Sequence, residues 1–169
     1  MCKPTLLEKA ILMATMYHTG QKDQADEPYI LHPLRVMNYV WHGNVYQPRD
    51  ADYKAPEKAL AVAMLHDVLE DCDVDPEELT NMGMPEEVVA TVKLLTHAEE
   101  DSYDTYVRRI KDSGNEIALQ VKLADLADNT DPKRMLVVKK QDPEAAKRRV
   151  KKYTNALEIL TGKTYNIEV

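Results

Sequence analysis

Cysteine is rare in this chain of 169 residues, which contains only Cys2 and Cys72. Two cysteines exclude a disulfide framework and a cysteine-rich structural zinc site. Glycine is also rare, with five residues, and there is no internal repeat or low-complexity tract. Without a candidate linker, and with too few residues for a second catalytic domain, the sequence predicts a single domain over residues 1–169.

Long apolar runs are absent as well. No segment reaches the roughly 20 apolar residues that a membrane-spanning helix requires. The N-terminal segment contains an apolar patch, but Glu8 and Lys9 lie within it and no small-residue cleavage site follows, which argues against a signal peptide. We therefore expect a cytoplasmic protein with no membrane partner.

Acidic residues outnumber basic ones, 29 against 22, and the formal net charge is −7. Because nucleic-acid affinity depends mainly on neutralising phosphates, this balance argues against a nucleic-acid partner. Residues 133–152 depart from it, with nine Lys and Arg residues against two acids. This segment is either a solvated helix face or a basic rim for a small polyanion such as a nucleotide phosphate.

Prolines mark the expected helix starts. At four positions an acid follows a proline that suits the first helical position: Pro56, Pro76, Pro85 and Pro143. Proline is already restricted to helical φ, and acids complement the positive end of the helix dipole. The sequence therefore predicts an all-α domain with a loop over residues 43–54. The expected helices span about residues 5–17, 33–41, 56–70, 76–81, 85–95, 102–111 and 116–129, with a closing basic helix at about 143–161.

Residues 59–71, ALAVAMLHDVLED, combine an apolar run with metal-ligand side chains. The apolar residues leave no polar face, so this part of the helix should be buried on all sides. On a continuous helix, Glu70 and Asp71 follow His66 and Asp67 by one turn. Acids are unfavourable at a helix C-terminus, so three together need a cation, which we interpret as a metal. A helix end that emerges into water as an acidic loop is the alternative.

The segment EIALQVKLADLADN, residues 116–129, also places polar side chains within an apolar helix. Asn129 lies one turn after Asp125, so both can face one pocket. The alternative is an amphipathic helix whose Lys122, Asp125 and Asp128 point to water.

A hydrolytic metal site needs nitrogen and oxygen ligands, an open position for water and a group that manages protons. Imidazoles from His32 and His66 with carboxylates from Asp67 and Asp125 make a mixed set of this kind, suited to manganese, iron or zinc. A lone histidine such as His32 is more often structural. The order along the chain, His, then His-Asp, then Asp, is the more telling signal.

Four motifs in this order resemble the HD-domain phosphohydrolases, and within them the ppGpp hydrolase domain of RelA/SpoT-type enzymes and their small stand-alone relatives. The motifs are HTGQ at 18–21, EPYILHPLRV at 27–36, HDVLED at 66–71 and VKLAD at 121–125 with a trailing Asn129. The resemblance covers about residues 10–134. It implies a single-domain HD-type helical bundle with metal-dependent phosphohydrolase activity.

The resemblance also implies residue roles. One divalent metal, typically manganese with iron or zinc as alternatives, would be held by His32, His66, Asp67 and Asp125. Glu70 and Asp71 would orient the attacking water and accept its proton. Asn129 would contact the substrate ribose or phosphate, and Lys122 would offset charge on the leaving group.

Three positions depart from the family pattern. The loop before EPYI has Asp23 where the family usually has an Arg associated with the guanine base, and Asp26 in place of a Gly. An acid cannot stack on a base as a cation does. His97 stands where Lys is more common, and a histidine is charged only part of the time near neutral pH.

The leading functional expectation is hydrolysis of a nucleotide-like phosphate ester or pyrophosphate, with removal of the 3′-diphosphate from ppGpp as the best single substrate. The altered loop keeps a second reading open, in which an HD-type phosphohydrolase acts on another nucleotide. A non-catalytic nucleotide-binding regulatory module is the third, although the presence of Glu70 and Asp71 argues against it. The sequence also allows the protein to form a homo-oligomer.

Overall fold

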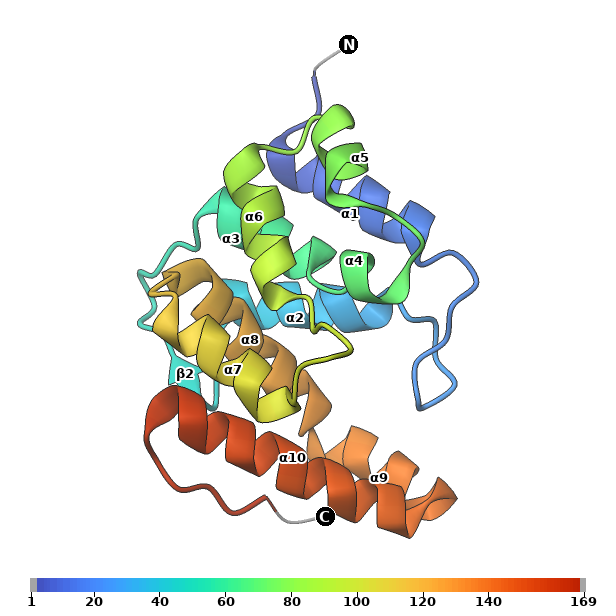
Figure 1. Cartoon of the computed structure of the whole chain (residues 1–169), viewed down its shortest axis with the longest axis vertical. Coiled ribbons are helices and arrows are strands. Elements are labelled where there is room, and N and C mark those ends of the chain that lie inside the picture. The colour runs from blue at the N-terminus through green and yellow to red at the C-terminus, as the bar shows by residue number, and fades with distance from the viewer. Residues whose placement is uncertain (1–2, 168–169) are drawn as a thin grey trace.

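The computed structural model describes residues 3–167, and the elements in this range are helices and one small hairpin (Figure 1). The prediction of an all-α fold is confirmed. The elements are α1 (Leu6–Tyr17), α2 (Leu31–His42), β1 (Gly43–Asn44), β2 (Gln47–Pro48), α3 (Glu57–Leu65), α4 (Val68–Asp71), α5 (Pro76–Asn81), α6 (Glu86–Leu95), α7 (Tyr103–Asp112), α8 (Glu116–Asn129), α9 (Pro132–Gln141) and α10 (Pro143–Thr161). The strands β1 and β2 pair antiparallel within the predicted loop.

Side-chain caps explain most helix starts. Pro76 and Pro143 occupy the first helical turn as predicted, each after an aspartate whose carboxylate accepts from the helix backbone: one N–H group at Asp75 and two at Asp142. Pro56 and Pro85 instead stand one residue before their helices, at the N-cap, with extended ψ angles of 139° and 143°. The expected position of these two prolines was therefore wrong by one residue.

Helix α9 was not predicted from the sequence. It begins with the same signature, since the Asp131 side chain accepts from the N–H groups of Lys133 and Arg134, and Pro132 opens the helix. Its single fully buried residue is Met135, so it lacks the long apolar stripe that identifies a helix by periodicity.

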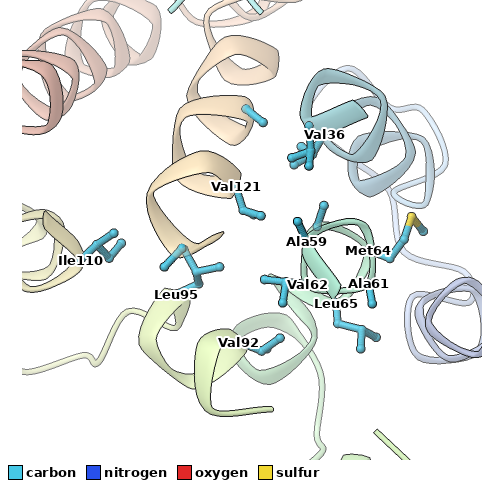
Figure 2. Packing of buried hydrophobic residues seen from close by; sticks show 14 of the residues in the cluster. Val36, Ala59, Ala61, Val62, Met64, Leu65, Val92, Leu95, Ile110 and Val121 are labelled. Atoms are coloured by element: carbon cyan, nitrogen blue, oxygen red, sulfur yellow. The ribbon is translucent and has the colours of Figure 1, made fainter. Parts of the chain in front are cut away.

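Helix α3 lies at the centre of the core. All seven residues from Ala59 to Leu65 are buried, as their composition predicts. Helices α1, α2, α6 and α8 pack around it. Figure 2 shows Ala59 and Val62 of α3 facing Val36 of α2 and Val121 of α8. A helix surrounded in this way fixes the position of whatever follows its last residue.

The prediction of one continuous helix over residues 56–70 was wrong. The α3 helix ends at Leu65, and α4 begins at Val68 after a turn at His66 and Asp67. Asp67 has φ −100° and ψ −5°, a right-handed conformation that departs from the ideal helical values. On a regular helix two adjacent side chains point about 100° apart. The turn removes that restriction and lets both residues face one point.

The closing helix is confirmed as α10, which packs against α7, α8 and α9 along one side of the molecule (Figure 1). Its buried side includes Tyr153, Leu157 and Leu160. Among residues 3–167, no helix has both the length and the apolar composition that crossing a bilayer requires. Cys72 is a free thiol, and Cys2 lies outside the described residues.

The burial of α3 predicts a large energetic difference between two leucines. Leu65 is 0% exposed and Leu12 of α1 is 66% exposed. Leu65→Ala should lower the free energy of unfolding by about 2–5 kcal/mol, because it removes buried methyl groups and leaves a cavity. Leu12→Ala, the control, should change it by less than about 1 kcal/mol. Urea denaturation of both variants measures the difference, and equal effects would contradict the central position of α3.

Candidate metal centre and its cavity

A cavity of about 310 Å³ opens beside the turn between α3 and α4. The lining contains seven of the eight predicted site residues: His32, Asp67, Glu70, Asp71, Lys122, Asp125 and Asn129. The eighth, His66, is buried, and its Nε2 atom lies 3.0 Å from Asp67 Oδ2. Residues from α2, the α3–α4 turn, α4 and α8 therefore meet at one place, although they are far apart in the sequence.

The four predicted metal ligands converge. His32 Nε2 lies 3.3 Å from Asp67 Oδ2 and 3.4 Å from Asp125 Oδ1. His66 Nε2 lies 3.9 Å from Asp125 Oδ1. Nitrogen and oxygen donors at these separations surround a point where a divalent ion would be within reach of all of them. The His32, His66 and Asp67 donor atoms lie within 4.8 Å of one another, which marks this trio as a candidate metal-binding group.

The hydrogen bonds of the two imidazoles indicate which nitrogen faces the cluster. His66 Nδ1 lies 2.8 Å from the carbonyl oxygen of Ala63, which can only accept, so Nδ1 carries the proton. In the neutral imidazole Nε2 carries a lone pair, and this buried atom, although 3.0 Å from Asp67 Oδ2, makes no hydrogen bond of acceptable geometry in the part of the chain described. His32 Nδ1 lies 2.7 Å from Asp128 Oδ2 and is held in the same way. A buried lone pair beside carboxylates fits a bound cation.

The pKa shifts of the cluster are also consistent with a bound cation. Burial by itself disfavours a charged His32, but hydrogen bonds with Asp125, Asp128 and Asp67 raise the pKa of this imidazole well above its ordinary value. Burial also opposes ionisation of Asp67, yet His66 and His32 hold the pKa of this carboxyl well below its usual range. The carboxylates are thus ionised in a buried place and attract positive charge, whether a proton or a metal ion.

Tyr29 joins the ligand cluster to the proposed catalytic pair, and its role was not predicted. Its hydroxyl oxygen lies 2.7 Å from Asp67 Oδ2 and 2.6 Å from Asp71 Oδ2. Burial and the neighbouring Asp67 raise the pKa of this phenol, so it keeps its single proton. The Tyr29 hydroxyl can donate this proton to only one carboxylate at a time, so the other carboxylate receives no hydrogen bond from Tyr29. The available signal was the position of Tyr29 three residues before His32 in the same motif.

Glu70 and Asp71 both border the cavity. Glu70 Oε2 accepts a hydrogen bond of 2.9 Å from the backbone N–H of His97. Burial and the nearby Asp67 raise the pKa of the Glu70 carboxyl, which makes it a stronger base than a solvated glutamate. The His97 ring lies with Nε2 2.9 Å from the Asp101 carbonyl oxygen, so that nitrogen donates to the backbone.

Helix α8 contributes a buried polar group, not a solvated face. Lys122, Asp125 and Asp128 are exposed by 7%, 5% and 0%, so the reading in which they point to water is wrong. Lys122 Nζ lies 2.8 Å from Asp125 Oδ2, and Asn129 Nδ2 donates to Asp125 Oδ1. Burial alone would lower the pKa of Lys122, but the charge of Asp125 raises it well above its usual value. Lys122 and Asn129 therefore hold the Asp125 side chain, and their contact with substrate stays a prediction.

Asp128 is a positioning residue that the sequence pattern did not identify. Its Oδ2 lies 2.7 Å from His32 Nδ1 and 3.3 Å from Arg134 Nη1, while Oδ1 lies 2.6 Å from Arg35 Nε. A carboxylate behind a ligating imidazole fixes the orientation of the ring and increases its basicity. Asp128 thus connects the candidate metal ligand His32 to two arginines from α2 and α9.

The same arginines bind the loop before α2. Arg134 Nη1 lies 2.9 Å and Arg35 Nη2 3.4 Å from Asp23 Oδ2, and the Asp23 side chain is only 3% exposed. Asp23 Oδ1 also accepts from the backbone N–H of Ala25 at 2.8 Å. Asp26, which replaces the Gly of the family pattern, has φ 63°, a left-handed conformation that glycine favours. The acid at position 23 therefore supports the loop.

Comparisons with known proteins agree with the motif order and the fold. No protein-family model matches the chain. A protein of Borreliella burgdorferi named guanosine-3′,5′-bis(diphosphate) 3′-pyrophosphohydrolase is 33% identical over 88 residues, which cover 52% of this chain and 12% of that protein. One of Mycoplasma pneumoniae, named a probable enzyme of the same activity, is 27% identical over 150 residues, covering 80% of this chain and 19% of the relative. The chain thus spans less than a fifth of the length of these curated relatives.

A solved structure has the same fold. It is described as a metazoan ortholog of SpoT that hydrolyses ppGpp, and it aligns with a TM-score of 0.75 over 99% of this chain and 92% of its own. The sequence identity is 21%, so this likeness concerns the fold. The predicted resemblance to HD-type ppGpp hydrolase domains is confirmed, and so is the expected helical architecture.

Asp128→Asn tests the positioning role. The amide keeps the size of the side chain but loses the charge that faces His32, Arg35 and Arg134, so we expect Mn²⁺ affinity to fall by about 10- to 100-fold. Asp112→Asn on the exposed end of α7 is the matched control and should leave the affinity unchanged. Calorimetric titration of metal-free protein measures the Kd. Equal affinities for the two variants would show that Asp128 does not act on the metal ligands.

Proposed function

We propose that this chain is a metal-dependent phosphohydrolase that removes the 3′-diphosphate from ppGpp. The observation that carries the proposal is the cavity beside which the Nε2 atoms of two buried imidazoles meet the carboxylates of Asp67 and Asp125, next to Glu70 and Asp71. The names of the curated relatives and the description of the structural neighbour support the same substrate class.

We infer that one divalent ion is held by His32, His66, Asp67 and Asp125. A mixed nitrogen and oxygen set suits Mn²⁺, with Fe²⁺ and Zn²⁺ as alternatives. When bound, such an ion lowers the pKa of a coordinated water and polarises a phosphoryl oxygen. The buried Nε2 atom of His66, which lacks a hydrogen-bond partner among residues 3–167, supports this ligand assignment.

The other site residues act on water and substrate. Glu70 is the proton acceptor, because burial raises the pKa of its carboxyl and the His97 backbone N–H orients its Oε2. Asp71 lies within a hydrogen bond of Tyr29 and orients the water from the other side. Asn129 and Lys122 keep Asp125 in place and offer N–H groups at the cavity wall for the ribose or the leaving group.

A second candidate function changes the base while keeping the chemistry. Residues 21–26 contain no arginine, and Asp23 in this loop is neutralised by Arg134 and Arg35. Lys22 and Gln24 are the neighbouring side chains that line the cavity. A loop of this composition does not repeat the guanine contact of the family, which favours a nucleotide with another base as the alternative substrate.

A substrate panel tests the proposal. Protein loaded with Mn²⁺ should convert ppGpp into GDP and pyrophosphate and should be inactive after chelation of the metal. Chromatography of reactions with ppGpp, pppGpp and 3′-phosphorylated adenine nucleotides measures the products. Faster turnover of an adenine nucleotide would replace the first candidate by the second. Binding of a nucleotide without turnover of any would overturn both and indicate a regulatory module.

Two variants separate proton transfer from metal binding. Glu70→Gln preserves the shape of the side chain but removes the proton acceptor, so kcat should fall by about 10²- to 10⁴-fold while Mn²⁺ still binds. Asp67→Ala removes a proposed ligand and should lose both activity and stoichiometric metal. Elemental analysis alongside single-turnover kinetics makes the comparison. Full metal content in Asp67→Ala would refute the ligand assignment, and an active Glu70→Gln would refute the proton-transfer role.

A further inference from the structure

The cavity is lined by four cationic side chains: Lys22, Lys122, Arg134 and Lys152. Three of them are already paired with carboxylates: Lys22 with Asp26 at 2.7 Å, Lys122 with Asp125 at 2.8 Å and Arg134 with Asp23 at 2.9 Å. Lys152 forms no such ion pair among residues 3–167. It is the cation of the cavity that has no carboxylate within ion-pair distance in the described part of the chain, although Asp125 and Glu70 act on it from farther away.

The near neighbours of Lys152 in the described part of the chain are aromatic and cationic side chains. Its Nζ lies 4.5 Å from the ring centroid of Tyr103 and 4.9 Å from that of Tyr153, at the rim of the cavity. Burial, Lys122 and Arg149 together lower the pKa of Lys152. Aromatic faces stabilise an ammonium group, but they do not neutralise it as a carboxylate would. An anion that entered the cavity would find this charge available.

The position of Lys152 relates it to the candidate metal centre. Lys122 Nζ lies 5.4 Å from the ring centroid of Tyr103, so the two lysines share one aromatic ring. Lys122 in turn contacts the proposed ligand Asp125. Lys152 comes from α10 and not from the loop of residues 21–26, whose one basic residue, Lys22, is paired with Asp26. A phosphorylated substrate bound at the metal centre would therefore extend toward α10.

We propose that Lys152 binds a phosphate group of the substrate and supplies the free positive charge that the loop of residues 21–26 does not offer. This inference rests on the proposed function for the class of substrate, a nucleotide with a diphosphate. It makes α10 a wall of the substrate site as well as the helix that closes the fold. Within the basic segment of residues 133–152, Lys152 then binds phosphate, while the neighbouring basic residues form a solvated face.

Binding of inorganic pyrophosphate tests the proposal directly. In the Mn²⁺-loaded full chain, Lys152→Met should weaken pyrophosphate binding by about tenfold or more, because one charge-assisted contact is lost. Lys152→Arg should retain most of the affinity. Lys151→Met is the matched control, since Lys151 carries the same charge at the neighbouring position and is exposed outside this cavity. Calorimetry gives the affinities, and urea denaturation checks that the three variants are equally stable.

Steady-state kinetics with ppGpp then distinguishes substrate binding from a structural role. Lys152→Met should raise KM with a smaller effect on kcat, and Lys151→Met should change neither. Equal pyrophosphate affinities for the two Met variants, or no pyrophosphate binding by the unmodified protein, would overturn the role of Lys152. If the unmodified protein binds pyrophosphate but does not cleave ppGpp, the proposed function fails, and the affinities of the variants still decide the role of Lys152.

Discussion

Buried negative charge is the constraint on which the site depends. Asp67, Asp125 and Asp128 carry side chains with relative exposures of 19%, 7% and 1%, and they lie around one imidazole, His32. A carboxylate removed from water is strongly unfavourable unless cations or hydrogen-bond donors surround it. The chain meets this requirement differently at each acid. Asp125 has Lys122, Asp128 has two arginines, and Asp67 has the imidazoles and the single proton of Tyr29.

This distribution explains why the turn after α3 is needed. Packing on all sides fixes the apolar α3 helix, and this fixes the position of its C-terminal end. The turn at His66 and Asp67 interrupts the regular helix. Both side chains can then reach the point that His32 and Asp125 also face. Because packing fixes α3 and charge pairing fixes His32 and Asp125, the donor atoms are held in place before any ligand binds, which favours tight binding of a cation.

The sequence was most informative about features that short motifs determine, such as helix starts and candidate metal ligands. Proline and acid pairs located the starts of α5 and α10, and the order of His32, His66-Asp67 and Asp125 identified four residues that do converge. It was least informative about contacts between distant residues. The hydrogen bond between His32 and Asp128 joins positions separated by 96 residues, and neither residue alone indicates the other. The break in the central helix was missed as well, and the two residues at the break, His66 and Asp67, have neighbours that are distant in the sequence, Asp125 and His32.

Asp23 supports the loop structurally, an effect that its residue type alone did not predict. An acid in the loop cannot stack on a base as a cation does, and this part of the expectation rests on chemistry alone. Its carboxylate, however, is directed to Arg134 and Arg35, so it adds little repulsion to a phosphorylated ligand. Its effect is geometric: it ties the loop to the arginines that also hold Asp128, and through Asp128 to His32. The loop that borders the cavity and the imidazole of the candidate metal centre are thus supported by one set of ion pairs, so a change in the position of one should alter the position of the other.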